Sequence, residues 1–332
     1  MSTGGARETL LHALLRHTAI LGLTLVPLLL LWSEPYCVNV LTTTYLFAGL
    51  AAAWNIIGGF GGQFSLGHGV FFGLGAYSVA RLYLDLGLSP WLGLIPAAAL
   101  ATAIALLVSW PTFRLRGPFF AIATMAINEV CFALANYSDR LTGGPRGLLI
   151  PFRAGTSNMI FAERWKYALL TFAFMTLVVL STVAVRRSRL GYYLLAVRED
   201  EDAAHAAGID VLKIKLLGMA LSAALTGIGG GLFAMYVRVL DPPTLFALSE
   251  IGVKFALLTL IGGLGTVLGP VAGAIAILPI ESWLRTTFGG LTPGAHMIVL
   301  GLVLMLSALF LKHGIVGASQ SLCSRFASGG QR

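Results

Sequence analysis

"GGFGGQFSLGHG", residues 58–69, combines six glycines with three polar side chains, Gln63, Ser65 and His68. Apolar runs flank it on both sides, which places it at the depth of a membrane rather than in a water-exposed loop. Irregular backbone is tolerated at that depth only where protein buries it or water lines it. Each glycine also costs a helix about 1 kcal/mol relative to alanine. We therefore expect a break, or a tightly packed junction, between two membrane helices.

The composition of the whole chain supports a membrane location. Of its 332 residues, 57% are hydrophobic and 11% are charged. A soluble domain carries about 25% charged residues, so this chain cannot cover a water-facing surface. Its apolar runs are continuous rather than alternating, which favours helices over a barrel. The sequence therefore predicts an all-α polytopic membrane protein.

The charge and the cysteines exclude several other classes. The net charge is +8, an excess expected from the orientation rule of membrane proteins. No basic patch is interleaved with stacking aromatics, so we expect no nucleic-acid partner. Cys37, Cys131 and Cys323 are odd in number and widely spaced, which indicates neither a disulfide framework nor a metal site.

The apolar segments give the expected topology. A membrane helix needs about 20 apolar residues, and ten segments are candidates: residues 16–32, 38–57, 65–84, 90–110, 118–137, 165–185, 212–238, 250–266, 270–288 and 294–311. Ten crossings return both termini to one side. Assigning that side as cytoplasm puts most lysines and arginines inside, although the basic residues of the 138–166 loop oppose it.

This topology divides the chain into three parts. Residues 1–15 form a cytoplasmic N-terminal segment, and residues 16–312 form a single transmembrane domain that includes a cytoplasmic loop at 186–213. Residues 313–332 lack periodicity, and we expect a disordered cytoplasmic tail.

One predicted membrane helix, residues 212–238, carries small residues at every fourth position. Residues four apart lie on one face of a helix. Small residues allow another helix backbone to approach closely in a membrane. We interpret this stripe as a helix-packing face, formed by Gly218, Ser222, Thr226, Gly230 and Ala234.

The cytoplasmic loop contains "REDEDAAHAAG" (198–208), which has the marks of a short surface helix. Acidic residues 199–202 occupy the first turn, where they complement the helix dipole, and Gly208 stands at the stop. The exposed alanines, among them Ala203 and Ala204, suit a helix docked in the groove of another protein. A solvated connector is the alternative.

The segment "AVREDEDAAHAAGIDVLKIKLL" (196–217) resembles the corresponding loop of the LivM-type branched-chain amino acid permease family. The residues that fall on its pattern are Arg198, Glu199, Glu201, Ala203, Ala204, Gly208 and Lys215. Four further segments agree in order along the chain: residues 58–77, 114–126, 142–148 and 262–274. Together they are spread over most of the length of residues 50–310.

The resemblance implies the permease subunit of an ATP-driven importer in the bacterial inner membrane. It implies a cytoplasmic coupling helix between helices six and seven, pairing with a second, LivH-type permease subunit, and two cytoplasmic ATPases that bind ATP and Mg. It also implies a periplasmic binding protein that delivers branched-chain or related amino acids. The ATPase-coupling residues would be Arg198, Glu199, Glu201, Ala203, Ala204 and Gly208. The chain has no G-x-x-x-x-G-K-[ST] loop and is expected to hold no cofactor itself.

Polar residues within the predicted spans are candidates for the pathway or for a polar core: Asn55, Gln63, Ser65, His68, Thr124, Asn128 and Glu129. Glu129 has two interpretations: a polar lining of the pathway, or a contact inside the bundle. The second would be a helix–helix hydrogen bond or an ion pair, with Arg116 or Lys254 as candidate partners. Ser65 and His68 lack the surrounding motifs of serine or zinc hydrolases, so we expect no catalytic residues.

The turn-rich "TGGPRG" (142–147) is expected to lie outside the membrane and to contact the binding protein through Thr142, Gly143, Gly144 and Arg146. A simple connector is the alternative. Two other functions remain open: the permease of a urea, amide or sugar importer, and an ion-coupled secondary transporter. Discontinuous helices occur in secondary transporters, but these need no alanine-rich docking helix.

Overall fold

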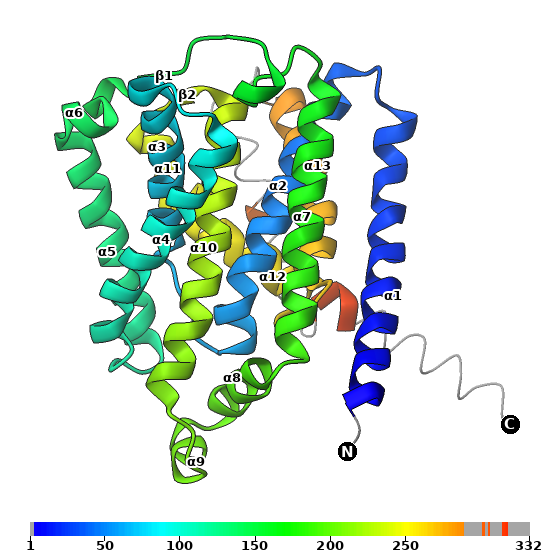
Figure 1. Ribbon diagram of the computed structural model, residues 1–332, viewed down its shortest axis with the longest axis vertical. Coiled ribbons are helices and arrows are strands. Elements are labelled where there is room, and N and C mark those ends of the chain that lie inside the picture. Colours follow the sequence, from blue (N-terminus) through cyan, green and yellow to red (C-terminus); the bar gives the residue numbers. More distant parts are fainter. Residues whose placement is uncertain (1–2, 289–300, 303–304, 306–313, 318–332) are drawn as a thin grey trace, which may run out of the picture.

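The computed structural model describes residues 3–288, 301–302, 305 and 314–317 (Figure 1). Its longer helices run side by side in one bundle: α1 (Thr3–Leu30), α2 (Pro35–Asn55), α3 (His68–Leu86), α4 (Pro90–Thr112), α5 (Pro118–Tyr137), α7 (Arg164–Arg186), α10 (Val211–Val237), α12 (Lys254–Gly263) and α13 (Gly269–Phe288). The shorter elements are η1 (Ile56–Phe60), α6 (Asp139–Thr142), η2 (Gly144–Arg146), η3 (Thr156–Asn158), α8 (Arg189–Glu199), α9 (Glu201–Ala206), α11 (Pro242–Leu245) and η4 (Leu248–Val253).

Six helical stretches of the described chain are long and apolar enough to cross a membrane: residues 35–60, 90–112, 118–137, 164–186, 211–237 and 242–263. A shorter apolar helix covers residues 17–30. The prediction of a polytopic helical membrane protein is therefore confirmed. The first nine predicted segments each coincide with a helix, and the tenth lies almost wholly outside the described residues.

Helix α2 forms the centre of the bundle because it is apolar around its whole circumference. Every residue from 44 to 60 is buried, as expected for a helix without a polar face. The indole of Trp54 is 0% exposed and is the largest fully buried side chain. Because α2 contacts α7, α10, α12 and α13, it fixes the positions of the surrounding helices.

Helix α10 packs its small residues against α2, α3 and α4. All five members of the predicted packing stripe, from Gly218 to Ala234, are buried. A Cβ atom at Gly230 would lie 2.0 Å from the Phe72 carbonyl oxygen, and one at Gly75 would lie 2.0 Å from that of Gly227. The backbones of α3 and α10 therefore touch directly, which larger side chains would prevent.

The opening glycine stretch contains the predicted break. Helix α2 continues through the π-helical turn η1, residues 61–67 are not helical, and α3 begins at His68. We call residues 61–67 the first junction. A second junction, residues 264–268, separates α12 from α13. In both places the chain leaves one buried helix and enters the next through a few irregular residues.

Two features mark opposite ends of the bundle. Helices α8 and α9 lie at the lower end in Figure 1, where the N-terminal end of α1 also lies. At the upper end, β1 (Leu148–Leu149) pairs antiparallel with β2 (Val239–Leu240), with Leu148 opposite Leu240. This small ribbon ties the 143–163 loop to the end of α10.

The structure describes parts of both predicted terminal segments. Helix α1 starts at Thr3, so residues 3–15 of the predicted N-terminal segment are helical and continuous with the first apolar segment. Residues 314–317 of the predicted disordered tail are helical, and Gly314 lies against the Gly263 backbone. The other residues of that tail lie outside the described part of the chain.

Candidate functional site

The segment between α7 and α10 folds as two helices rather than the single short helix predicted. Arg198 and Glu199 end α8, and Asp200 adopts an extended conformation that breaks the helix. The Asp200 carboxylate then caps α9 by accepting hydrogen bonds from the backbone N–H groups of Asp202 and Ala203, both at 2.9 Å. A side-chain acceptor at this position satisfies N–H groups that the helix leaves unpaired. The acidic run thus builds a helix start, two residues later than expected.

The exposure of α9 corrects one predicted contact residue. Ala203 is exposed as expected, whereas Ala204 is buried against the bundle. Gly208 has a φ of +83°, the left-handed conformation that glycine adopts most readily at a helix end. Helix α9 therefore presents a face of Ala203, Ala206 and Ala207 and uses Ala204 to pack on its own chain.

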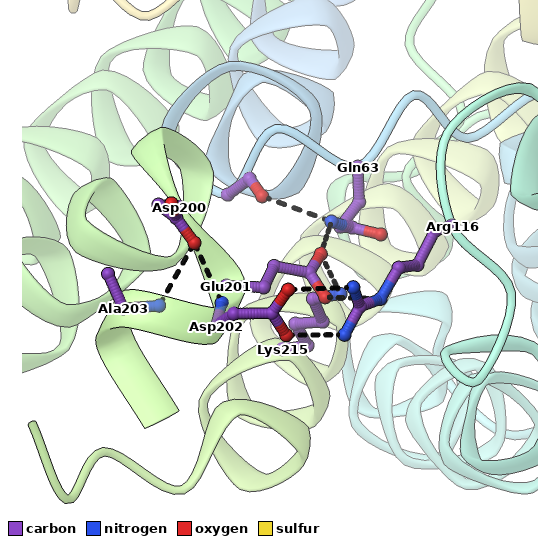
Figure 2. A network of polar contacts seen from close by, with 8 residues as sticks. Gln63, Arg116, Asp200, Glu201, Asp202, Ala203 and Lys215 are labelled. Atoms are coloured by element: carbon purple, nitrogen blue, oxygen red, sulfur yellow. Dashed lines mark hydrogen bonds and ion pairs between the residues drawn. The ribbon is translucent and has the colours of Figure 1, made fainter. Parts of the chain in front are cut away.

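Glu201 joins three parts of the chain in one polar network (Figure 2). Its Oε1 atom accepts a hydrogen bond from Gln63 Nε2 at 3.2 Å and a charge-assisted hydrogen bond from Lys215 Nζ. Lys215 is 1% exposed and its side chain lies over the ring of Phe113. A buried ammonium group is tolerated only when it is paired, so Glu201 is the counterion that permits Lys215 to stay charged.

Arg116, from the α4–α5 connection, extends the network to the solvent side. Its NH1 and NH2 atoms donate to the two carboxylate oxygens of Asp202 at 3.0 and 2.7 Å. Its Nε atom lies 3.9 Å from Glu201 Oε2. These hydrogen bonds lower the pKa of the Asp202 carboxyl group. The bidentate geometry fixes orientation, although both side chains are exposed and the pair contributes little stability.

Arg198 links the α8–α9 segment to both junctions. Its NH1 atom donates to the Gly59 carbonyl oxygen at 2.7 Å. Cβ atoms added at Gly62 or Gly265 would lie 2.9 and 2.5 Å from the Arg198 side chain. Arg186 also reaches the second junction, where its NH1 atom donates to the Gly265 carbonyl oxygen at 3.4 Å. Because Gly62 and Gly265 have no side chains, the Arg198 side chain packs directly against the backbone of the junctions.

Asn55 ties the end of α2 to the second junction. Its Nδ2 atom donates to the Thr266 carbonyl oxygen at 2.8 Å, and its Oδ1 atom accepts from the Gly265 N–H at 3.0 Å. Asn55 is 0% exposed. An amide that both donates to and accepts from irregular backbone replaces the hydrogen bonds that the helix break removes. Asn55 precedes the first junction in the sequence, but both of its hydrogen bonds are with the second junction.

A chain of hydrogen bonds crosses the core behind the first junction. Trp54 Nε1 donates to the Ser65 carbonyl oxygen at 2.7 Å. His68 Nδ1 lies 3.0 Å from Ser65 Oγ and Nε2 lies 2.9 Å from Ser222 Oγ. Ser222 donates its own hydroxyl proton to the Ala53 carbonyl oxygen at 2.8 Å. A hydroxyl has one proton, so His68 donates from Nε2 and accepts from Ser65 at Nδ1.

The three predicted polar residues of α5 separate onto different faces. Thr124 and Asn128 are buried: Thr124 Oγ1 accepts from the Leu66 N–H at 3.0 Å, and Asn128 Nδ2 donates to the Phe246 carbonyl oxygen at 2.8 Å. Glu129 lies on the opposite, exposed face. The interpretation of Glu129 as an ion pair inside the bundle is therefore wrong.

The two proposed partners of Glu129 are engaged elsewhere. Arg116 binds Asp202, as described above. Lys254 lies between two carboxylates, 2.7 Å from Glu250 Oε2 and 3.0 Å from Glu281 Oε1. Helical spacing predicts the position of Glu129 on α5. It does not predict the ion-pair partner of Glu129, because that depends on which helices pack next to α5.

At the upper end, the "TGGPRG" turn is built largely from its own residues. Thr142 and Gly144 are buried, and Thr142 Oγ1 donates to the Ser138 carbonyl oxygen at 2.8 Å and accepts from the Gly144 N–H at 3.2 Å. Gly143 and Gly144 both have positive φ. Arg146 is exposed, so it is the residue of this group that the turn presents to solvent.

Lys215 and Trp54 are structural determinants of the site that the sequence did not single out as site residues. Lys215 stands one turn into α10, and an apolar helix that carries a lysine near its end is usually explained by snorkelling to water. Trp54 is one apolar residue in a long apolar run. Neither residue stands out in the sequence. Its role depends on a hydrogen-bond partner from another segment: Glu201 for Lys215 and Ser65 for Trp54.

The network at the lower end borders a polar groove. A polar groove of about 360 Å³ separates the first junction and Arg116 from the α8–α9 segment. Its walls are joined by the Glu201 contacts with Gln63 and Arg116. The described residues contain no cluster of three or more His, Cys, Asp or Glu side chains placed to hold a metal ion. The Glu201–Gln63 hydrogen bond therefore connects α9 to the first junction.

Comparisons with known proteins give a consistent result. Residues 36–308 match the family described as branched-chain amino acid transport system / permease component. The high-affinity branched-chain amino acid transport permease LivM of Escherichia coli K12 is 30% identical, over 84% of this chain and 69% of that protein. LivH of the same organism is 24% identical and BraD of Pseudomonas aeruginosa is 26% identical, each over 84% of this chain and 94% of the relative. No solved structure matches.

Proposed function

This chain belongs to the family of branched-chain amino acid transport system permease components, and from that membership we propose the role of its parts in an importer. The chain is a multi-pass permease subunit of an inner-membrane ABC importer, and ATP hydrolysis is done by separate subunits. We propose that it forms one half of the translocation pathway for branched-chain or related amino acids. A LivH-type permease would form the other half, since relatives of both kinds match this chain.

We propose ten membrane helices with both termini in the cytoplasm and with α8 and α9 on the same side. The single observation that carries the coupling role is the attachment of this segment to η1 and to the first junction, through the Arg198 hydrogen bond to Gly59 and the Glu201 hydrogen bond from Gln63. An ATPase docked on α9 would thereby act on the irregular backbone of the first junction. A periplasmic binding protein would dock at the opposite end, near Arg146.

Reconstitution tests the function directly. We expect proteoliposomes that contain this chain, a LivH-type subunit and the two ATPases to take up leucine only when ATP and the loaded binding protein are present. Vesicles containing this chain alone should show no uptake. Leucine uptake by the lone chain, driven by an ion gradient, would contradict the proposal, whereas ATP-driven uptake of urea, an amide or a sugar in place of leucine would support the related importer instead.

Replacing Ala203 with aspartate should separate docking from folding. Ala203 is the third residue of α9, where a carboxylate complements the helix dipole, so the variant should fold as the wild type does. An aspartate buried without a partner in an apolar docking groove is unfavourable, and we expect at least tenfold less ATPase to copurify with the permease. Ser157→Asp, exposed at the opposite end, is the control. Equal ATPase recovery with both variants would show that α9 is a connector.

Reversing the charge of Arg146 should weaken the response to the binding protein. Arg146 is exposed on a turn that its buried neighbours hold in place, so Arg146→Glu leaves the turn intact. Charges at the rim of an interface act mainly on association rate and salt dependence. We expect several-fold slower uptake at low ionic strength and a smaller difference at high salt. A salt-independent or unchanged rate would place the binding protein elsewhere.

A further inference from the structure

Glu129 differs from the other charged residues within the membrane helices. The inner face of α5 buries Phe120, Thr124, Asn128 and Ala135 against the bundle. Glu129 lies near the middle of the helix on the outer face, beside the exposed side chains of Ile122 and Met125. Among the described residues, no hydrogen bond or ion pair involves its carboxylate, whereas Lys254 of α12 and Glu281 of α13 are paired with each other.

A carboxylate in this position indicates that the surface around Glu129 does not contact lipid. Placing an acidic side chain at the bilayer centre costs about 2.5–3.5 kcal/mol on insertion scales, and such residues almost always face a bundle interior or a water-filled cavity. The outer face of α4 is built differently, because it exposes apolar side chains such as Ile95, Ala103 and Leu107. The outer face of α5 at Glu129 is therefore covered by water or protein in the assembled importer.

We propose that Glu129 binds the α-ammonium group of the amino acid as it passes through the membrane. This proposal rests on the proposed function, because it takes the transported molecule to be an amino acid. The carboxylate supplies the charge that an ammonium group requires, and Ile122 and Met125 supply an apolar surface for an aliphatic side chain. Together they match the two ends of a branched-chain amino acid.

The immediate neighbours of Glu129 leave room for a ligand. Ala126 precedes it by three residues and Ala133 follows it by four, so both lie next to it on the helix surface, and both are exposed. The small methyl side chains of Ala126 and Ala133 leave space for a ligand to approach the Glu129 carboxylate along more than one turn of the helix. The alternative occupant is a basic side chain of the second permease, which would form a permanent ion pair.

Cysteine accessibility distinguishes water from lipid at this position. In a background with Cys37, Cys131 and Cys323 replaced by serine, Glu129→Cys is compared with Ala103→Cys on the outer face of α4. The probe is a permanently cationic methanethiosulfonate, which reacts with the thiolate formed in water. In the assembled importer we expect Glu129→Cys to react at least tenfold faster than Ala103→Cys. Equal rates would overturn the proposal, since they would place position 129 in lipid or in a sealed interface.

Transport by charge-matched variants then tests the ligand. We expect Glu129→Gln to assemble normally and to lower the maximal rate of ATP-dependent leucine uptake at least tenfold, with Glu129→Asp closer to wild type. The concentration of loaded binding protein at half-maximal rate should change less than twofold, because docking occurs at the far end. Wild-type rates with Glu129→Gln, or loss of the permease pair on replacement, would overturn the proposal. Failure of the wild-type importer to move amino acids would instead refute the proposed function.

Discussion

Replacing Glu201 with alanine is expected to destabilise the protein by about 3 kcal/mol or more and to abolish leucine uptake. The change leaves the Lys215 ammonium group, which is 1% exposed, without its counterion. Breaking a buried ion pair by removing one partner typically costs about 3–5 kcal/mol. The same substitution removes the hydrogen bond from Gln63, and with it the link between α9 and the first junction. Thermal unfolding of the purified permease measures the first effect, and uptake by the reconstituted importer measures the second.

Two further variants identify the cause of this effect. Asp202→Ala removes the exposed pair with Arg116, whose members are 76% and 66% exposed, and should leave the unfolding temperature close to that of the wild type. Glu201→Leu combined with Lys215→Met removes both charges, which is often neutral, together with the acceptor of the Gln63 hydrogen bond, and should restore stability without restoring uptake. If the double variant transports at the wild-type rate, the network has a structural role only.

Replacing Gly230 with valine is expected to prevent the bundle from assembling. A Cβ atom at Gly230 would lie 2.0 Å from the carbonyl oxygen of Phe72, and that oxygen belongs to the backbone of α3. No side-chain rotation relieves such a contact, so the two helices must separate. Overpacking of cores typically costs about 1–3 kcal/mol, and this contact between backbones should lie at or above the upper end. The measurement is the yield of folded permease after detergent extraction, with its unfolding temperature.

Gly22→Val provides the matched control for the same chemical change. Gly22 lies in α1, and a Cβ atom placed there has nothing within 4 Å. A β-branched residue slightly disfavours a helix in either position, so any large difference between the two variants reflects packing between helices. Comparable yields would mean that α3 and α10 are not in the described contact.

The sequence predicted the architecture because hydrophobicity and glycine content are local properties. Apolar runs of membrane-spanning length required helices, and the glycines of residues 58–69 required a break between two of them. The four-residue spacing from Gly218 to Ala234 required a close-packed face, since helical geometry alone puts these residues on one side. Helix start and stop signals at Asp200 and Gly208 likewise act on their own backbone. None of these features depends on distant residues.

Partners were the information that the sequence lacked. Ala204 was expected on the exposed face of α9 and is buried. Thr142 and Gly144 were expected to contact the binding protein, and both are buried within their own turn. Glu129 was assigned possible partners that bind other carboxylates. In each case the residue type was noticed, but its burial and its partners depend on how the surrounding chain folds.

By itself, the sequence determined the membrane location, the helical class, the glycine break and the family to which the chain belongs, because each is encoded in short patterns. Only the tertiary structure decided that Asn55 holds the second junction rather than the first, and that Arg198 and Glu201 connect α8 and α9 to the helix breaks. It also decided that Glu129 faces outward. Hydrogen bonds and ion pairs act over a few ångströms, so they are fixed only when folding brings distant segments together.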